Sequence, residues 1–328
     1  MSAPQGPADW PDNPVLVEVR RSGFLESAHR GSLVVLDATG SVTFAAGAVD
    51  RPVLPRSSNK PVQATALLAA GWRPRSPEEL AIGAGSHNGE DGHRELAAAM
   101  LAAAGLGPDD LGCPPALPQH EATRAAWLVE GRQPDRLAMN CSGKHAAMLS
   151  ACVAAGWPTA GYLDRDHPLQ QVIESRLAEA AAEPVTAVVV DGCGAPQHAL
   201  SVTGLARGVL ALVQAPEGSR DRSVADAMRA HPWLVAGTGR EDTDLMTAIP
   251  GLLVKGGADG VHVAALPGRG AVALKLDDGG DRGRTPALAA GLRRLRVPDE
   301  VLARWAVTPL SGGDSVVGEV RAAPLLLL

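Results

Sequence analysis

Aromatic side chains are scarce in this 328-residue sequence, at 3% of the residues. The apolar core must therefore be built from Ala, Val and Leu, within an overall apolar content of 45%. The sequence also lacks an excess of positive charge, because its formal net charge is −6 and its acidic and basic residues are interspersed. This composition offers no basic surface of the kind that binds nucleic acid.

The sequence contains no apolar stretch long and continuous enough to cross a bilayer. Its first 13 residues are polar and rich in proline, unlike a secretory signal peptide. Cysteine is also sparse, and four cysteines in a chain of this size favour reduced thiols over a disulfide framework: Cys113, Cys141, Cys152 and Cys193. We therefore expect a cytoplasmic protein that does not span a membrane.

The predicted strands lie towards both ends of the chain, and the predicted helices are concentrated in its middle. Strand patterns occur at 15–19, 31–37, 41–45, 185–190, 251–255, 261–266 and 271–276, the run at 185–190 being apolar enough for a buried strand. Helix patterns occur at about 57–70, 92–104, 141–155, 168–182, 224–230, 286–294 and 299–306. This distribution predicts an α+β fold with one mixed antiparallel sheet drawn from both chain ends. We expect a single domain over 1–328, with a β-sheet subregion at about 14–56 and 185–328 and a helical subregion at about 57–184.

A Ser-x-x-Lys pattern, Ser57 to Lys60, lies where the first predicted helix begins. Residues i and i+3 share a helix face, so the Lys60 amine can reach the Ser57 hydroxyl. A serine hydroxyl is a weak nucleophile until a base takes its proton, and a desolvated lysine can be that base. The helix N-terminus also offers free N–H groups to a developing oxyanion. Alone, however, the pattern more often marks a solvated Ser and Lys.

Two later elements strengthen this interpretation. A Ser-x-Asn element begins at Ser86 in a predicted loop, and a Lys-x-Gly element begins at Lys255 on a predicted strand end. The three elements recur in this order in serine β-lactamases and penicillin-binding proteins. They supply a nucleophile with its base, a second hydroxyl for proton relay, and a cation. Each later element alone fits a polar turn or a surface lysine, but together they predict one catalytic site.

A second group of candidate residues contains two cysteines and a lysine. Cys141 and Lys144 lie at i and i+3 of one predicted helix, and Cys193 follows a predicted strand. Two thiolates are natural zinc ligands, and a further nitrogen or oxygen donor with water would complete a tetrahedron. Lysine is an uncommon ligand because its amine must lose its proton, which burial beside Zn²⁺ favours. Two buried cysteines without a metal explain the spacing at least as well.

Taken together, these blocks resemble the Rhizobium etli-type asparaginases, also called class 3 or asparaginase II-like. The blocks that carry the resemblance lie at 56–61, 86–90, 140–145 and 191–194, with further agreement at 235–240 and 255–261. The similarity extends over nearly the whole chain. It implies a fold like those of serine β-lactamases and glutaminases, a homodimer, and L-asparagine amidohydrolase activity.

The resemblance also implies roles for individual residues. By matching position, Ser57 and Lys60 form one Ser–Lys tandem, and Ser86 and Lys255 form a second. The resemblance leaves open which of the two serines attacks the substrate. The expected reaction is acyl transfer, in which a serine attacks the side-chain carboxamide, ammonia leaves, and water then releases aspartate.

A zinc site is implied in the same way. Cys141, Lys144 and Cys193 match the metal ligands, with water completing the shell. Asp191 matches a neighbour of that site, which His145 can join. The metal is expected to orient the substrate rather than to activate water.

Other classes of protein share some of these features. A penicillin-recognising acyl-enzyme has the Ser-x-x-Lys pattern but gives no reason for the block at 140–145. A non-catalytic metal-binding or regulatory protein explains the cysteines but leaves both Ser–Lys pairs without a role. Glutamine is a closer alternative substrate, since one methylene changes binding by only about 1–3 kcal/mol.

Overall fold

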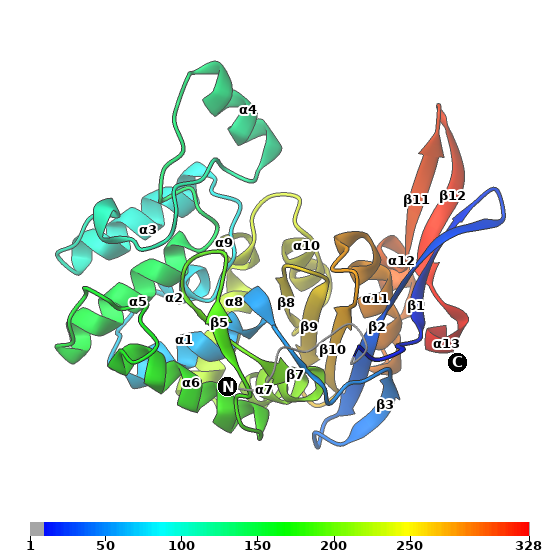
Figure 1. Cartoon of the computed structure of the whole chain (residues 1–328), viewed down its shortest axis with the longest axis horizontal. Helices are drawn as coiled ribbons and strands as arrows, with labels where there is room; N and C mark the ends of the chain where they lie inside the picture. Colours follow the sequence, from blue (N-terminus) through cyan, green and yellow to red (C-terminus); the bar gives the residue numbers. More distant parts are fainter. Residues whose placement is uncertain (1–9, 328) are drawn as a thin grey trace.

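Strands from both ends of the chain meet in one antiparallel sheet, as predicted (Figure 1). The computed structural model describes residues 10–327. The strand order is β11-β12-β1-β2-β10-β9-β8. In addition, β3 pairs with residues 33–36 of β2. Its strands are β1 (Val15–Arg21), β2 (Phe24–Asp37), β3 (Val42–Ala46), β8 (Leu253–Gly257), β9 (Val261–Leu266), β10 (Gly270–Leu276), β11 (Val307–Gly312) and β12 (Ser315–Ala322). The predicted α+β fold class is therefore confirmed.

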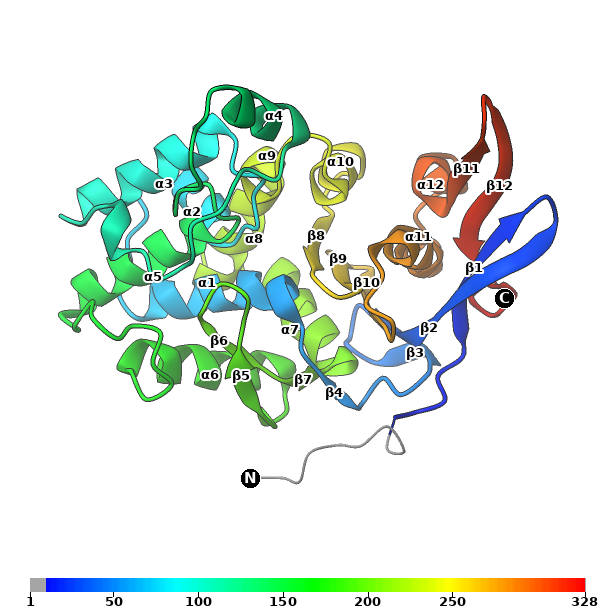
Figure 2. The same cartoon turned by 45° about the horizontal axis from the view of Figure 1, so that its top comes forward.

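Alanine-rich helices form the other half of the molecule (Figure 2). Nine of the ten residues of α1 are buried, because it packs against α5, α6, α7 and α8. Small side chains let these helix backbones approach closely. The helices are α1 (Lys60–Ala69), α2 (Pro77–Gly83), α3 (Asp91–Ala103), α4 (Glu121–Val129), α5 (Ser142–Ala155), α6 (Pro168–Ala181), α7 (Val202–Gln214), α8 (Arg220–Ala230), α9 (Pro232–Val235), α10 (Glu241–Ala248), α11 (Arg284–Arg294), α12 (Asp299–Ala306) and α13 (Pro324–Leu327). Short 3₁₀ turns are η2 (Arg56–Asn59), η3 (Pro108–Asp110) and η4 (Asp281–Gly283).

Helix α7 joins the helical half to the sheet. It packs on β2, β9 and β10 and also against α6 and α8. The Ser201 side chain accepts the Gly204 N–H at the helix start, which satisfies one of the free N–H groups there. Both halves thereby share one apolar core, built largely from Ala, Val and Leu as the composition requires.

The structure differs from the sequence prediction at several elements. The predicted buried strand at 185–190 is wrong, because only β5 (Val188–Val190) forms there and Val190 is exposed. Strand β5 pairs with the short β6 (Pro196–His198), away from the main sheet. A second small sheet forms where β4 (Pro52–Val53) pairs with β7 (Leu200–Ser201). Helices α2, α4, α7 and α10 and strands β11 and β12 were not predicted. Part of the region expected to be β-sheet, between 202 and 248, is therefore helical.

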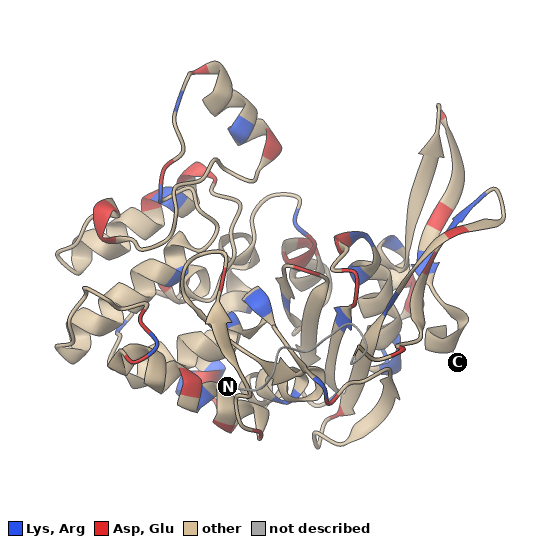
Figure 3. Ribbon diagram, viewed as in Figure 1, with Lys and Arg blue, Asp and Glu red and all other residues tan. Residues whose placement is uncertain are grey.

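Charged residues of both signs are scattered over the elements (Figure 3). None of the helices between residues 10 and 327 is both long enough and apolar enough to cross a membrane. All four cysteines are buried and none forms a disulfide.

Candidate active site

The candidate nucleophile Ser57 lies on the short turn η2 that precedes α1. Arg56, just before it, has φ of +52°, a conformation that is costly for a residue with a side chain. Its guanidinium bonds to Asp191 Oδ1 at 2.8 Å and forms a second ion pair with Asp259. These contacts hold the turn in its strained form, and the Ser57 side chain, half-buried, has no hydrogen-bond partner among residues 10–327.

Strand β8 supports this turn from the other side. The Ser58 hydroxyl donates to the Lys255 carbonyl oxygen at 3.0 Å. A Cβ atom added to Gly257 would lie 2.6 Å from the Pro55 carbonyl oxygen, so only glycine allows the strand to approach this closely. The first predicted block and the Lys-x-Gly element are thus brought together by backbone packing.

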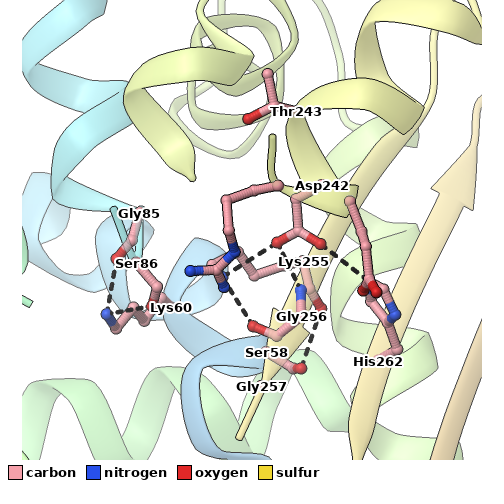
Figure 4. A network of polar contacts seen from close by, with 12 residues as sticks. Ser58, Lys60, Gly85, Ser86, Asp242, Thr243, Lys255, Gly256, Gly257 and His262 are labelled. Carbon is pink, nitrogen blue, oxygen red and sulfur yellow. Dashed lines mark hydrogen bonds and ion pairs between the residues drawn. The ribbon is translucent and has the colours of Figure 1, made fainter. Parts of the chain in front are cut away.

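Lys60 is the residue at which the predicted motifs converge. Its side chain is 1% exposed, and its Nζ donates to the Gly85 carbonyl oxygen and to Ser86 Oγ, each at 2.7 Å (Figure 4). A third hydrogen bond, of 3.0 Å, reaches Cys141 Sγ. Lys60 therefore contacts the second serine and the cysteine group directly, while no hydrogen bond joins it to the Ser57 hydroxyl.

The loop that carries Ser86 is fixed by its backbone. The Ser86 N–H donates to the Val235 carbonyl oxygen at 2.7 Å, and the His87 N–H donates to the Asn140 carbonyl oxygen at 3.0 Å. These bonds hold the loop between the segment before α5 and the end of α9. The position of Ser86 relative to Cys141 thus follows from main-chain contacts.

Lys255 contacts a carboxylate rather than the predicted Ser86. Its Nζ lies 3.4 Å from Asp242 Oδ2 and donates to the Gly256 carbonyl oxygen at 2.7 Å. Burial lowers the pKa of Lys255 to about 8, an effect that Asp242 opposes and that the nearby Lys60 charge reinforces. Ser86 and Lys255 make no direct hydrogen bond, so the two lysines share the site in a different pairing from the expected one.

The two predicted cysteines and their lysine lie together. Cys141 caps the start of α5, Lys144 lies in its first turn, and Lys144 Nζ is 3.3 Å from Cys193 Sγ. A hydrogen bond from Cys141 lowers the pKa of Cys193, against the effect of burial, and the Lys144 charge lowers it further. Burial alone would lower the pKa of Lys144, but the sulfurs of Cys193 and Cys141 and the Asp191 carboxylate raise it.

The donor atoms of this cluster fit a zinc ion. Between residues 10 and 327, no group of three or more His, Cys, Asp and Glu side chains is arranged to hold a metal. The cluster nevertheless offers two sulfurs and an amine, and the buried His145 Nε2 nearby has no hydrogen-bond partner. His145 Nδ1 is fixed by the Tyr162 hydroxyl at 2.6 Å. Sulfur and nitrogen donors of this kind suit Zn²⁺ better than a hard cation.

Asp242 and His262 belong to this region but were not predicted as site residues. The Asp242 carboxylate is buried and accepts hydrogen bonds from the Gly256 N–H of β8 and from His262 of β9. A signal was present, because Asp242, Leu245 and Met246 share one buried face of α10 at spacings of three and four. This pattern is visible only when residues 241–248 are taken as a helix.

Comparison with known proteins gives one match over most of the chain. The family model described as L-asparaginase II matches residues 17–322. None of the curated proteins matches the sequence.

Similar solved structures are distant. Mglu in its native form is 16% identical, with 87% of this chain and 67% of that chain covered and a TM-score of 0.45. The "putative beta-lactamase from Bacteroides dorei DSM 17855" is 14% identical, with 81% and 93% covered and a TM-score of 0.46. Mglu in its glutamate form is 15% identical, with 83% and 60% covered and a TM-score of 0.45.

Proposed function

The chain belongs to the L-asparaginase II family, and we propose that it hydrolyses the side-chain amide of L-asparagine to aspartate and ammonia. The observation that carries this proposal is the position of Lys60. Its buried Nζ contacts Ser86 Oγ, and in the sequence Lys60 closes the Ser-x-x-Lys pattern that begins at Ser57. A buried amine in contact with a serine hydroxyl is an arrangement that acyl transfer to serine uses. The remaining expectations from the sequence, a homodimer and a cytoplasmic location, stay predictions.

In the proposed mechanism, Ser57 attacks the carboxamide carbon and Lys60 accepts the hydroxyl proton, a step that requires the amine of Lys60 rather than its ammonium. Ser57 is the more accessible of the two serines, whereas Ser86 is 4% exposed. Free N–H groups at the start of the helix stabilise the oxyanion. Ser86 and Lys255 pass a proton to the departing nitrogen, so that ammonia leaves and an aspartyl ester remains on Ser57. Water then hydrolyses this ester and restores the serine.

Zinc has an orienting role in this proposal. Cys141, Lys144 and Cys193 would hold the ion, and it would orient the α-carboxylate and α-amino end of the substrate. Lys144 must give up its proton to act as a ligand, and each thiol must be a thiolate.

Metal analysis tests this assignment. The purified wild-type protein should carry up to one zinc per chain, and Cys141→Ser and Cys193→Ser should each lower that content, because each removes a sulfur donor. Affinity should weaken as pH falls, since protons compete for the thiolates. Cys152→Ser, which changes a buried cysteine further along α5, is the matched control and should leave the zinc content unchanged. Unchanged zinc in both ligand variants would remove the site.

The substrate is tested by ammonia release from asparagine and glutamine with one enzyme preparation. The anchors for the two substrate ends are Ser57 and the cysteine cluster, and both are fixed by packed backbone. An extra methylene misplaces the carboxamide carbon, and a displacement of about 1 Å can cost on the order of 10²-fold in rate. We therefore expect kcat/KM for asparagine to exceed that for glutamine by on the order of 10²-fold.

Three other outcomes would change the assignment. Equal values for the two amides would indicate a glutaminase-asparaginase, and a glutamine preference would indicate a glutaminase with the same serine chemistry. Hydrolysis of a chromogenic β-lactam without ammonia release would indicate a penicillin-recognising acyl-enzyme. No turnover of any of these compounds would favour a non-catalytic metal-binding protein.

A further inference from the structure

Asp242 is a buried carboxylate that lies outside every predicted motif and contacts Lys255. It is in the first turn of α10, and its side chain is 5% exposed. Oδ2 accepts the Gly256 N–H at 2.8 Å and lies 3.4 Å from Lys255 Nζ, and Oδ1 lies 2.9 Å from His262 Nε2 (Figure 4). One carboxylate thus links α10 to both β8, the strand that carries the candidate catalytic lysine, and β9.

The charge balance of the site shows why this contact matters. The chain contains only four lysines, Lys60, Lys144, Lys255 and Lys275, and the first three are buried at the site. An uncompensated buried charge is expensive, so each ammonium needs a partner. Lys144 has the sulfur of Cys193, and Lys60 donates three hydrogen bonds. Within the described part of the chain, Asp242 is the carboxylate that contacts Lys255.

Two other cationic side chains disfavour the ammonium form of Lys255. Lys60 from α1 and Arg240 before α10 both lower the pKa of Lys255, in addition to burial. Arg284 from α11 binds the neighbouring Gly257 carbonyl oxygen. His262 from β9 shares the Asp242 carboxylate. The carboxylate is itself ionised, because Lys255, His262 and the Gly256 N–H together hold the pKa of Asp242 well below its usual value, although burial alone would raise it.

We propose that Asp242 is a positioning residue for the amide hydrolysis proposed above: it holds the Lys255 side chain at the site and keeps it as the ammonium that donates a proton to the departing nitrogen. The inference rests on the proposed function. The step is balanced, because Lys255 gives its proton to the nitrogen that leaves as ammonia and regains one from the water that hydrolyses the ester, while the proton held by Lys60 returns to Ser57. Asp242 touches no reacting atom and acts through Lys255.

A titration that does not depend on turnover tests the first part of this proposal. In wild-type protein labelled with ¹³Cε- and ¹⁵Nζ-lysine, only four lysine side chains contribute signals, and Lys255→Met assigns one of them. In Asp242→Asn the pKa of Lys255 should fall by about 1–3, the effect of removing an opposite charge at this range. Glu241→Gln is the matched control, because Glu241 is adjacent and pairs with Arg284, and it should leave Lys255 unchanged.

The pH dependence of ammonia release from asparagine tests the second part. Activity that needs the Lys255 ammonium falls as pH rises through its pKa, so the alkaline limb of wild-type kcat/KM should lie near the pKa of about 8. In Asp242→Asn this limb should move to lower pH, with kcat/KM at pH 7.5 lower by on the order of 10-fold and partly recovered at lower pH. A loss of folded protein alone would lower activity equally at every pH.

Each result has a separate meaning. An unchanged Lys255 titration in a folded Asp242→Asn variant would overturn the inference, as would an alkaline limb that does not move. If the variant does not fold, the wild-type titration decides, because a neutral Lys255 amine at pH 7 would overturn the inference and an ammonium supports it. Absence of ammonia release by the wild-type enzyme would refute the proposed function while the lysine titration still tests the Asp242–Lys255 contact.

Discussion

Replacing Ser57 by alanine should lower kcat for asparagine hydrolysis by on the order of 10³-fold or more, with the fold intact. The proposed acyl-enzyme cannot form without the attacking hydroxyl, and the loss of a nucleophile in other serine hydrolases has this magnitude or more. The Ser57 hydroxyl has no hydrogen-bond partner among the described residues, so its removal breaks no hydrogen bond between them. Ammonia release under saturating asparagine measures kcat, and thermal unfolding checks the fold.

The adjacent serine provides the control for this experiment. Ser58→Ala removes a buried hydroxyl that donates to the Lys255 carbonyl oxygen, so it should affect stability more than kcat. Ser86→Ala, in turn, interrupts the proton relay and should slow the reaction less than Ser57→Ala does. If Ser57→Ala kept more than a tenth of the wild-type rate while Ser86→Ala lost it, Ser86 would be the nucleophile.

Replacing Lys60 by methionine should have an effect of similar size, on the order of 10³-fold in kcat. Methionine has similar length but no amine, so the Ser57 proton has no acceptor. The change also leaves the Gly85 carbonyl oxygen, Ser86 Oγ and Cys141 Sγ without a donor. We therefore expect a measurable loss of stability as well, on the order of 1–3 kcal/mol for an unsatisfied buried acceptor, from chemical denaturation.

A double variant separates the catalytic effect from the structural one. Residues that act as a unit fail together, so Ser57→Ala with Lys60→Met should be hardly slower than either single variant. Lys275→Met is a control, since Lys275 donates to the backbone carbonyls of Asp259 and Leu276 and makes no hydrogen bond to Ser57, Lys60 or Ser86. A double variant much slower than both single variants would mean that Ser57 and Lys60 act independently.

The fold could be predicted where the local pattern agreed with the final environment. The strands β8, β9 and β10 are short apolar runs separated by glycine turns, and they form as expected. Residues 185–190 have the same apolar character, but there the chain lies at the edge of the helical half and pairs only with β6. Whether an apolar run is covered depends on its neighbours, which a single sequence does not reveal.

The candidate site shows the same limit. The identities of Ser57, Lys60, Ser86 and Lys255 followed from motif and resemblance, and the structure brings their segments together. Their pairing could not be predicted, because it depends on approach between loops far apart in sequence. The i, i+3 argument paired Lys60 with Ser57, but Ser57 lies on a 3₁₀ turn before α1, and the Lys60 side chain extends to the 85–86 loop instead.

The pairing of β1 with β12 has a consequence for how the protein folds. Val17 is opposite Ala322, so two neighbouring strands inside this sheet are almost a whole chain apart in sequence. Contacts between distant residues carry a large loop-closure cost and slow folding. The alanine-rich helices rely on nearer contacts and can form first, whereas β8, which supports the Ser57 turn through Gly257, is anchored by a sheet that closes late. We therefore expect the Ser57 turn, although it is encoded early in the chain, to reach its final geometry only after β8 has joined the sheet.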